Sequence, residues 1–237
     1  MNTTFQKIII PVAIVLAGAL IAAAIYFTQS KPIHAPVAGG QNAAPADVKI
    51  APITSADHIR GKLDAKVTIV DYSDLECPFC KQFHSTLKQI FDQYGPTNQV
   101  AWVYRHFPLD IHPKSRKESE ASECAQELGG SDVFWKYVDA VYATTTSNNT
   151  LDPAKLPVIA DQIGLDKTAF TTCLNSGKYA AKVDAQYNDA RNAGGNGTPY
   201  TILVINGQNI PLVDNAGNGL GALPYAQFKS IIDQFVK

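Results

Sequence analysis

Residues 66–83 read KVTIVDYSDLECPFCKQF, a β-rich apolar run that is followed closely by two cysteines. The first part of this stretch, KVTIVDYS, predicts a buried strand. Apolar residues then recur at helical spacing as far as Gly95-Pro96, so a helix should begin at the cysteines and end there. A second strand is expected over residues 99–107, QVAWVYRHF. The crossover of such a strand–helix–strand unit should be right-handed, with its two strands parallel.

The two cysteines, Cys77 and Cys80, lie where the predicted strand ends and the predicted helix begins. A sulfur at a helix N-terminus faces unpaired backbone N–H groups and the positive end of the helix dipole, which favour thiolate over thiol. The thiolate is both the nucleophile and the leaving group in disulfide exchange, so this position indicates redox chemistry. We expect Cys77 to be the exposed, attacked sulfur and Cys80 to be the recessed, resolving one.

Two further positions bear on the cysteine pair. Asp71 precedes Cys77 on the predicted strand, where a buried carboxylate could accept a proton from Cys80. The other interpretation of Asp71 is a strand-end aspartate that is satisfied by backbone N–H groups. Far along the chain, Thr198-Pro199 enters another predicted strand. A cis bond there would place the backbone of Thr198 against the cysteines, where it could hold a peptide as a short added strand.

The stretch from 113 to 193 is predicted to be an all-α block between the two halves of the sheet. A run of mixed charges within it, residues 114–120, indicates a solvated helix face.

Strand signals return after this block. Residues 200–205 and 208–213 flank Asn206-Gly207, the strongest short hairpin signal. Pro224 begins a final amphipathic helix. The expected fold class is therefore α/β, a mixed sheet covered by helices with an all-α insertion.

The N-terminal region has the composition of a membrane anchor. Residues 8–27 contain no charged side chain, and about 20 apolar residues suffice to cross a bilayer. We predict an anchor within residues 1–27, a flexible linker over 28–47 and one domain over 48–237, held outside the cytoplasm at the cell membrane. A cleaved signal peptide is the alternative. The net charge of −1 provides no field for a polyanion, so nucleic acid is not an expected partner.

The other two cysteines, Cys124 and Cys173, each fall on a predicted helix of the all-α block. One interpretation is a disulfide that ties two helices together, as exported domains commonly use. The other is a second redox relay. We favour the structural disulfide.

Taken together, these motifs resemble the thioredoxin superfamily, and specifically its DsbA-like branch. The resemblance rests on the strand that ends in DYSDLE, on CPFC, on the GTP turn before the hairpin, on the final helix and on the helical insertion, and it covers residues 50–237. It implies that Cys77 and Cys80 are the redox pair, that Pro199 is a cis-proline and that Asp71 is the buried acid. The dipeptide Pro78-Phe79 differs from the Pro-His of the best-known oxidase of this branch.

Polar residues near the predicted site allow other interpretations. Cys77, Cys80 and His84 could form a metal site, but the local sequence lacks a fourth ligand. We therefore expect no metal and no cofactor, and His84 to be an exposed helix residue or a rim contact. Arg105 is interpreted as a surface cation at the end of a strand.

The function expected from the sequence is net disulfide formation in exported proteins. Unfolded or reduced exported proteins would be the substrates, and the resemblance implies a quinone-linked membrane protein of the DsbB or VKOR type as the reoxidant. One alternative is a disulfide reductase or isomerase that uses the same pair. Another is a tethered binding or holdase module in which the CPFC disulfide is merely structural.

Overall fold

The computed structural model describes residues 48–236. The predicted anchor (1–27) and linker (28–47) lie outside the described residues. Within the described part of the chain, none of the helices combines the length and the apolar character that a membrane span requires.

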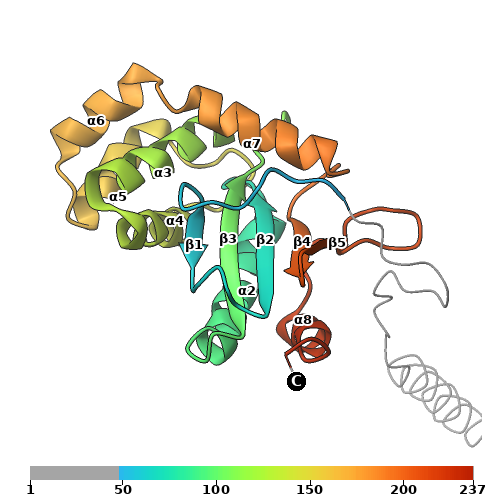
Figure 1. Cartoon of the computed structure of the whole chain (residues 1–237). Coiled ribbons are helices and arrows are strands. Elements are labelled where there is room, and N and C mark those ends of the chain that lie inside the picture. Colours follow the sequence, from blue (N-terminus) through green and yellow to red (C-terminus); the bar gives the residue numbers. More distant parts are fainter. Residues whose placement is uncertain (1–47, 237) are drawn as a thin grey trace, which may run out of the picture. The chain divides into compact units, whose positions relative to one another are not determined.

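A five-stranded mixed sheet forms the centre of the domain, in the order β1-β3-β2-β4-β5 (Figure 1). Strands β2 and β3 are parallel, and the other three pairings are antiparallel. The parallel pair and the β4–β5 hairpin confirm the prediction. The strands are β1 (His58–Arg60), β2 (Val67–Ser73), β3 (Val100–His106), β4 (Tyr200–Ile205) and β5 (Gln208–Pro211).

The turn between β4 and β5 shows why the sequence there makes a hairpin. Asn206 and Gly207 have φ values of 52° and 80°. Two consecutive residues in this left-handed region make the tight turn whose twist matches the two strands, and asparagine and glycine tolerate that region best. Pro211 ends β5, which is an edge strand of the sheet.

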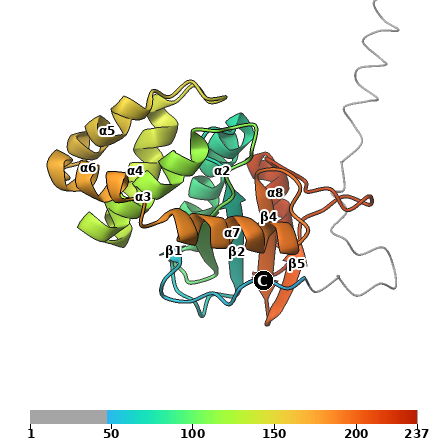
Figure 2. The same cartoon turned by 90° about the horizontal axis from the view of Figure 1, so that it is seen from above.

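Helices cover both faces of the sheet (Figures 1 and 2). Helix α2 (Pro78–Tyr94) lies on one face together with α8 (Tyr225–Ile232), and the rings of Phe83 and Phe228 meet at 5.2 Å. Helix α7 (Ala180–Asn192) covers the other face. There its Ala190 joins a buried cluster with Tyr72 and Ile202 of the sheet.

The predicted helical insertion is present; its helices before α7 lie at the β1 side of the sheet, and α7 runs across one face of the sheet (Figure 2). Its elements are α3 (Ser115–Gly129), α4 (Ser131–Thr144), a 3-10 turn (Pro153–Lys155), α5 (Leu156–Gln162), α6 (Lys167–Ser176) and α7. Aromatic side chains join it to the sheet: the Trp135 and Trp102 rings lie 4.6 Å apart. The short strand β1 was not predicted.

Candidate active site

Helix α2 begins at the cysteine pair, as expected. Cys77 is the residue that precedes the first turn, with extended backbone angles (φ −79°, ψ 123°), and Pro78 opens the helix. Proline suits this position because its missing N–H would have no partner there in any case. No side chain caps the helix, so the amides of its first turn face the Cys77 sulfur.

The pKa of the Cys77 thiol is lowered from 9.0 to about 6. The largest cause is a hydrogen bond from Cys80, and burial opposes it; Thr198 and the backbone N–H groups of Phe79 and Cys80 lower it further. The pKa of Cys80 is instead raised well above its usual value, first by burial and then by Cys77. The pair therefore contains one sulfur that ionises readily and one that keeps its proton.

The exposure of Cys77 differs from the expectation. Cys77 is only 4% exposed, and Cys80 is completely buried. The reason is the Thr198-Pro199 turn, which lies against it: the Cys77 thiol donates to the Thr198 carbonyl at 3.5 Å. The neighbouring Phe79 is 60% exposed, so the side chain beside the pair faces solvent. Cys77 is thus the outer sulfur, although it is recessed.

The Thr198–Pro199 peptide bond is cis. Pro199 directly precedes β4, whose first residue, Tyr200, pairs with Tyr72 of β2. Cys77 is the last residue of the short connection between β2 and α2. This register therefore brings the Thr198-Pro199 turn to the cysteine pair. The sequence placed these residues together correctly.

Asp71 lies on β2 and is 1% exposed. Burial raises its pKa from 3.8 to about 7, a hydrogen bond from Ser73 lowers it, and the charge of Cys77 raises it. The Ser73 hydroxyl donates to Oδ2 at 2.9 Å, and no backbone N–H of the described residues is bonded to the carboxylate. The charge of Asp71 in turn contributes to the raised pKa of Cys80. This arrangement fits the buried acid and not the backbone-satisfied aspartate.

Two acidic residues between β2 and Cys77 were not singled out in the sequence. Asp74 is fully buried; its carboxylate accepts the N–H groups of Glu76 and Leu109 and lies 2.8 Å from His112 Nδ1. The backbone N–H of Asp74 points at the Cys80 sulfur, 3.4 Å away. Acidic residues so close to a buried strand are unusual, and this was the sequence signal that could have identified these two positions.

Glu76 is fully buried, and it fastens the segment after α4 to the start of α2. Its carboxylate accepts the backbone N–H groups of Asn149 at 2.6 Å and Leu151 at 3.2 Å. Glu118 of α3, which the sequence placed on a solvated face, is 1% exposed. The run 114–120 is therefore only partly solvated, because α3 turns this carboxyl inward.

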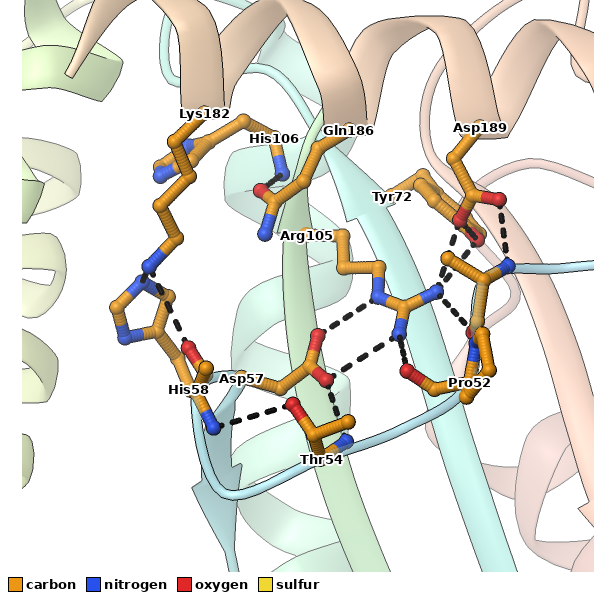
Figure 3. Close-up of polar contacts among 12 residues, drawn as sticks. Pro52, Thr54, Asp57, His58, Tyr72, Arg105, His106, Lys182, Gln186 and Asp189 are labelled. Carbon is orange, nitrogen blue, oxygen red and sulfur yellow. Dashed lines mark hydrogen bonds and ion pairs between the residues drawn. The ribbon is translucent and has the colours of Figure 1, made fainter.

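Arg105 is not a surface cation. It is 2% exposed on β3, and its guanidinium lies between Asp57 and Asp189, with an N–O distance of 2.8 Å to each (Figure 3). It also donates to the carbonyls of Ala51 and Pro52. The function of this arginine is to fasten residues 51–57 to the sheet.

His84 is also buried and not exposed, at 4%. Its Nε2 lies 2.6 Å from Asp139 Oδ1, and burial lowers its pKa. It is engaged on α4, so it does not join the cysteines in a metal site.

A different group brings ligand-type atoms together. His58, His106 and Glu123 are all buried, and one side-chain atom of each lies within 4.8 Å of the others. However, Lys182 Nζ lies 2.7 Å from Glu123, so an ammonium group already balances the carboxylate. Neither histidine Nδ1 has a partner among the described residues, whereas a metal-bound imidazole normally donates its second N–H to an oxygen. The residues fit a buried ion-pair cluster better than a metal site.

Cys124 of α3 and Cys173 of α6 are joined by a disulfide with an S–S distance of 2.07 Å. The bond links two helices of the insertion, as the structural interpretation expected.

The comparisons with known proteins agree with this geometry. A family model described as thioredoxin matches residues 54–234. Among solved structures, Pseudomonas aeruginosa DsbA2 is 27% identical, with a TM-score of 0.61 over 77% of this chain and 96% of that one. Wolbachia pipientis alpha-DsbA1 (23% identity, TM-score 0.64, 78% and 92% coverage) and Bacillus subtilis BdbD (21%, 0.64, 80% and 98%) share the fold.

Two curated relatives are named as Na(+)/H(+) antiporters, a different class of protein from the solved structures. The chain is 33% identical over 153 residues to the Na(+)/H(+) antiporter NhaA 3 of Salinispora tropica, which covers 64% of this chain. It is 32% identical over 143 residues to the Na(+)/H(+) antiporter NhaA of Herminiimonas arsenicoxydans, which covers 60%. The chain spans only 22% and 21% of the lengths of these two proteins.

Proposed function

This chain belongs to the thioredoxin family and is a DsbA-like thiol–disulfide oxidoreductase, and from that premise we propose that it oxidises cysteine pairs of exported proteins through Cys77 and Cys80. The observation that carries the proposal is the asymmetry of the pair. Cys77 sits at the mouth of α2 with a pKa lowered by its hydrogen bonds, while burial raises that of Cys80. A stabilised thiolate favours the reduced form of the pair, which makes its disulfide oxidising.

The reaction begins with the Cys77–Cys80 disulfide. A substrate thiolate attacks the Cys77 sulfur, the disulfide breaks, and Cys80 leaves as a thiolate that takes up a proton from Asp71. A second substrate thiolate then attacks the substrate sulfur of the mixed disulfide, and Cys77 leaves as a thiolate. Two electrons have passed from the substrate to the pair.

The turn at Thr198-Pro199 would hold the substrate during this exchange. The Thr198 carbonyl faces the Cys77 thiol at 3.5 Å, so an extended peptide that pairs with this turn would bring its own cysteine to that sulfur. The side chain of Phe79 beside the pair is apolar and exposed, which suits unfolded chains with exposed apolar side chains.

The proposed location is outside the cytoplasm, at the cell membrane. The Cys124–Cys173 disulfide supports it, because such bonds persist in oxidising compartments. Residues 1–27 would be the anchor, and a quinone-linked membrane protein of the DsbB or VKOR type would reoxidise the pair.

The test is a redox titration of residues 48–237 in glutathione buffers, with mass mapping of the cysteines that titrate. We expect Cys77 and Cys80 to titrate with a potential more oxidising than about −200 mV. A value near −270 mV would assign the pair to a reductase. If Cys77→Ser kept every substrate-related activity, the chain would be a binding module.

A further inference from the structure

Three neighbouring side chains on the sheet form a row beneath the cysteine pair. In the strand register, Asp71 of β2 pairs with Tyr104 of β3 on one side and with Thr201 of β4 on the other. Side chains in register on adjacent strands lie on the same face of a sheet. The charge of Asp71 acts on Cys80, so this is the face that carries the resolving sulfur.

Each member of the row is buried and has a polar atom without a partner. Tyr104 is completely buried, Asp71 is 1% exposed and Thr201 is 4% exposed. Asp71 Oδ1, the Tyr104 hydroxyl and the Thr201 hydroxyl have no hydrogen bond to any described group. Polar atoms left without a partner in a protein interior are uncommon and destabilising, so a row of three requires an explanation.

Among the other polar groups around Cys80, the Thr198 side chain interacts with this thiol and lowers its pKa, and two hydroxyl groups are engaged elsewhere. The Ser73 hydroxyl donates to Asp71 Oδ2 at 2.9 Å, and the Tyr142 hydroxyl donates to the Asp74 carbonyl at 3.3 Å. The Tyr142 side chain also acts on Tyr104 as a hydrogen-bond partner that lowers its pKa, although the two hydroxyls do not meet strict hydrogen-bond geometry.

Tyr104 also interacts electrostatically with the two groups whose charges change during the reaction. Burial raises its pKa well above 10.0, and the negative charges of Asp71 and Cys80 raise it further. The phenol therefore keeps its proton and acts as a donor. Because Cys80 and Asp71 exchange one proton in the reaction, the negative charge beside this donor alternates between a sulfur and a carboxylate.

We propose that Tyr104 is a positioning residue for the resolving cysteine. Its hydroxyl donates to the Cys80 thiolate when the sulfur carries the charge, and to the free Oδ1 of Asp71 when the carboxylate does. A donor that follows the charge lowers the cost of ionising either group in a buried site. This inference rests on the proposed function, because it concerns the chemistry of the same cysteine pair.

The step affected is the resolution of a mixed disulfide on Cys77. The Asp71 carboxylate takes the proton of the Cys80 thiol, and the Cys80 sulfur attacks that of Cys77. The bond between Cys77 and the outside thiol breaks, and that thiol leaves as a thiolate with the electron pair. The Cys77–Cys80 disulfide forms, so the pair is oxidised and the bound thiol is reduced.

The experiment uses the full-length chain in detergent, with a mixed disulfide between Cys77 and glutathione. The release of glutathione by Cys80 is followed in stopped flow across a range of pH. In the unaltered chain this rate should rise as the pH approaches neutral, because burial, the largest cause, raises the pKa of Asp71 well above 3.8 and does not depend on the charge of Cys77. Tyr104→Phe should move the midpoint upward by about one pH unit and slow release roughly fivefold at pH 7, because the carboxylate loses a donor. The pH dependence of Cys77 alkylation should not change.

A matched control is Tyr137→Phe. This tyrosine is also completely buried, but its hydroxyl donates to the Leu156 carbonyl within the helical insertion. The midpoint of glutathione release should stay in place in this variant. An equal shift in both variants would mean that a lost buried hydroxyl acts through stability alone, which overturns the proposal.

Two further outcomes also overturn it. One is a folded Tyr104→Phe protein with an unchanged midpoint, and the other is a shift in Thr201→Val that Tyr104→Phe does not show. If Tyr104→Phe does not fold, Tyr104→3-fluorotyrosine retains the ring and strengthens the donor, so the midpoint should fall; no shift would refute the role. Failure of the proposed function is separate, because it is read from the reduction potential and from Cys77→Ser.

Discussion

Glu118 provides a sharp test of how the acids behind the cysteine pair are held. Burial, followed by a hydrogen bond and the charge of Glu76, raises its pKa from 4.5 to about 9. Both of its oxygens nevertheless lie outside strict hydrogen-bond geometry with every described group. At neutral pH this carboxyl keeps its proton in the folded protein and loses it in the unfolded chain. Stability therefore falls as the pH rises from 4.5 towards 9.

The size of this effect follows from the pKa difference. Between pH 4.5 and pH 7, each unit costs about 1.4 kcal/mol, so the penalty at pH 7 reaches about 3 kcal/mol. Glu118→Gln removes the ionisable group with little change in volume. We expect the variant to be more stable than the unaltered chain by up to about 3 kcal/mol at pH 7 and nearly equal to it at pH 4.5.

Urea unfolding of residues 48–237 at pH 4.5 and pH 7 measures this difference. Glu120→Gln is the control, because Glu120 lies on the same helix in an ion pair with Lys117 at 3.4 Å and is less buried. Its effect should stay within about 0.5 kcal/mol at both pH values. The reasoning is refuted if Glu118→Gln is destabilised at both values, or if its advantage does not grow with pH.

Three other outcomes are expected. The rate of Cys77 alkylation in the reduced protein should have its pH midpoint near 6, with Cys80 unreactive there; a midpoint above 8 would contradict the lowered pKa. Replacing Cys124 and Cys173 together by alanine should cost about 4 kcal/mol of unfolding free energy for a sequence separation of 49, while dithiol oxidation persists; loss of activity in a folded variant would instead indicate a redox relay. Arg105→Met should cost about 3 kcal/mol in urea unfolding because it leaves two largely buried carboxylates without a countercharge, and a cost below 1 kcal/mol would show that residues 51–57 are held otherwise.

The elements that the sequence predicted well are those whose signals are local. Strand β2, helix α2 and the hairpin turn at Asn206-Gly207 each carry their own pattern of apolar spacing or turn residues. Strand β1 was missed because it has only three residues, and its extended form depends on pairing with β3. No periodicity can be read in so short a segment.

The errors at single residues have a common cause. Arg105, His84 and Glu118 were all placed at the surface because charged and polar side chains usually lie there. Each is buried with an interacting group far away in the sequence: Asp189 is 84 residues from Arg105, and Asp139 is 55 from His84. Such partners become visible only when the fold brings the elements together. The recessed position of Cys77 has the same origin, since Thr198 lies 121 residues away.

The attachment of residues 48–57 has a mechanical consequence. The backbone N–H of Val48 donates to Asn209 on the outer side of β5, and Arg105 holds the carbonyls of Ala51 and Pro52. A force applied to the chain before residue 48 would therefore act first on the backbone hydrogen bond of Val48 and then on the contacts of the Arg105 guanidinium. The contacts at the edge of the sheet would break first, so the force would not change the geometry around the two reactive sulfurs.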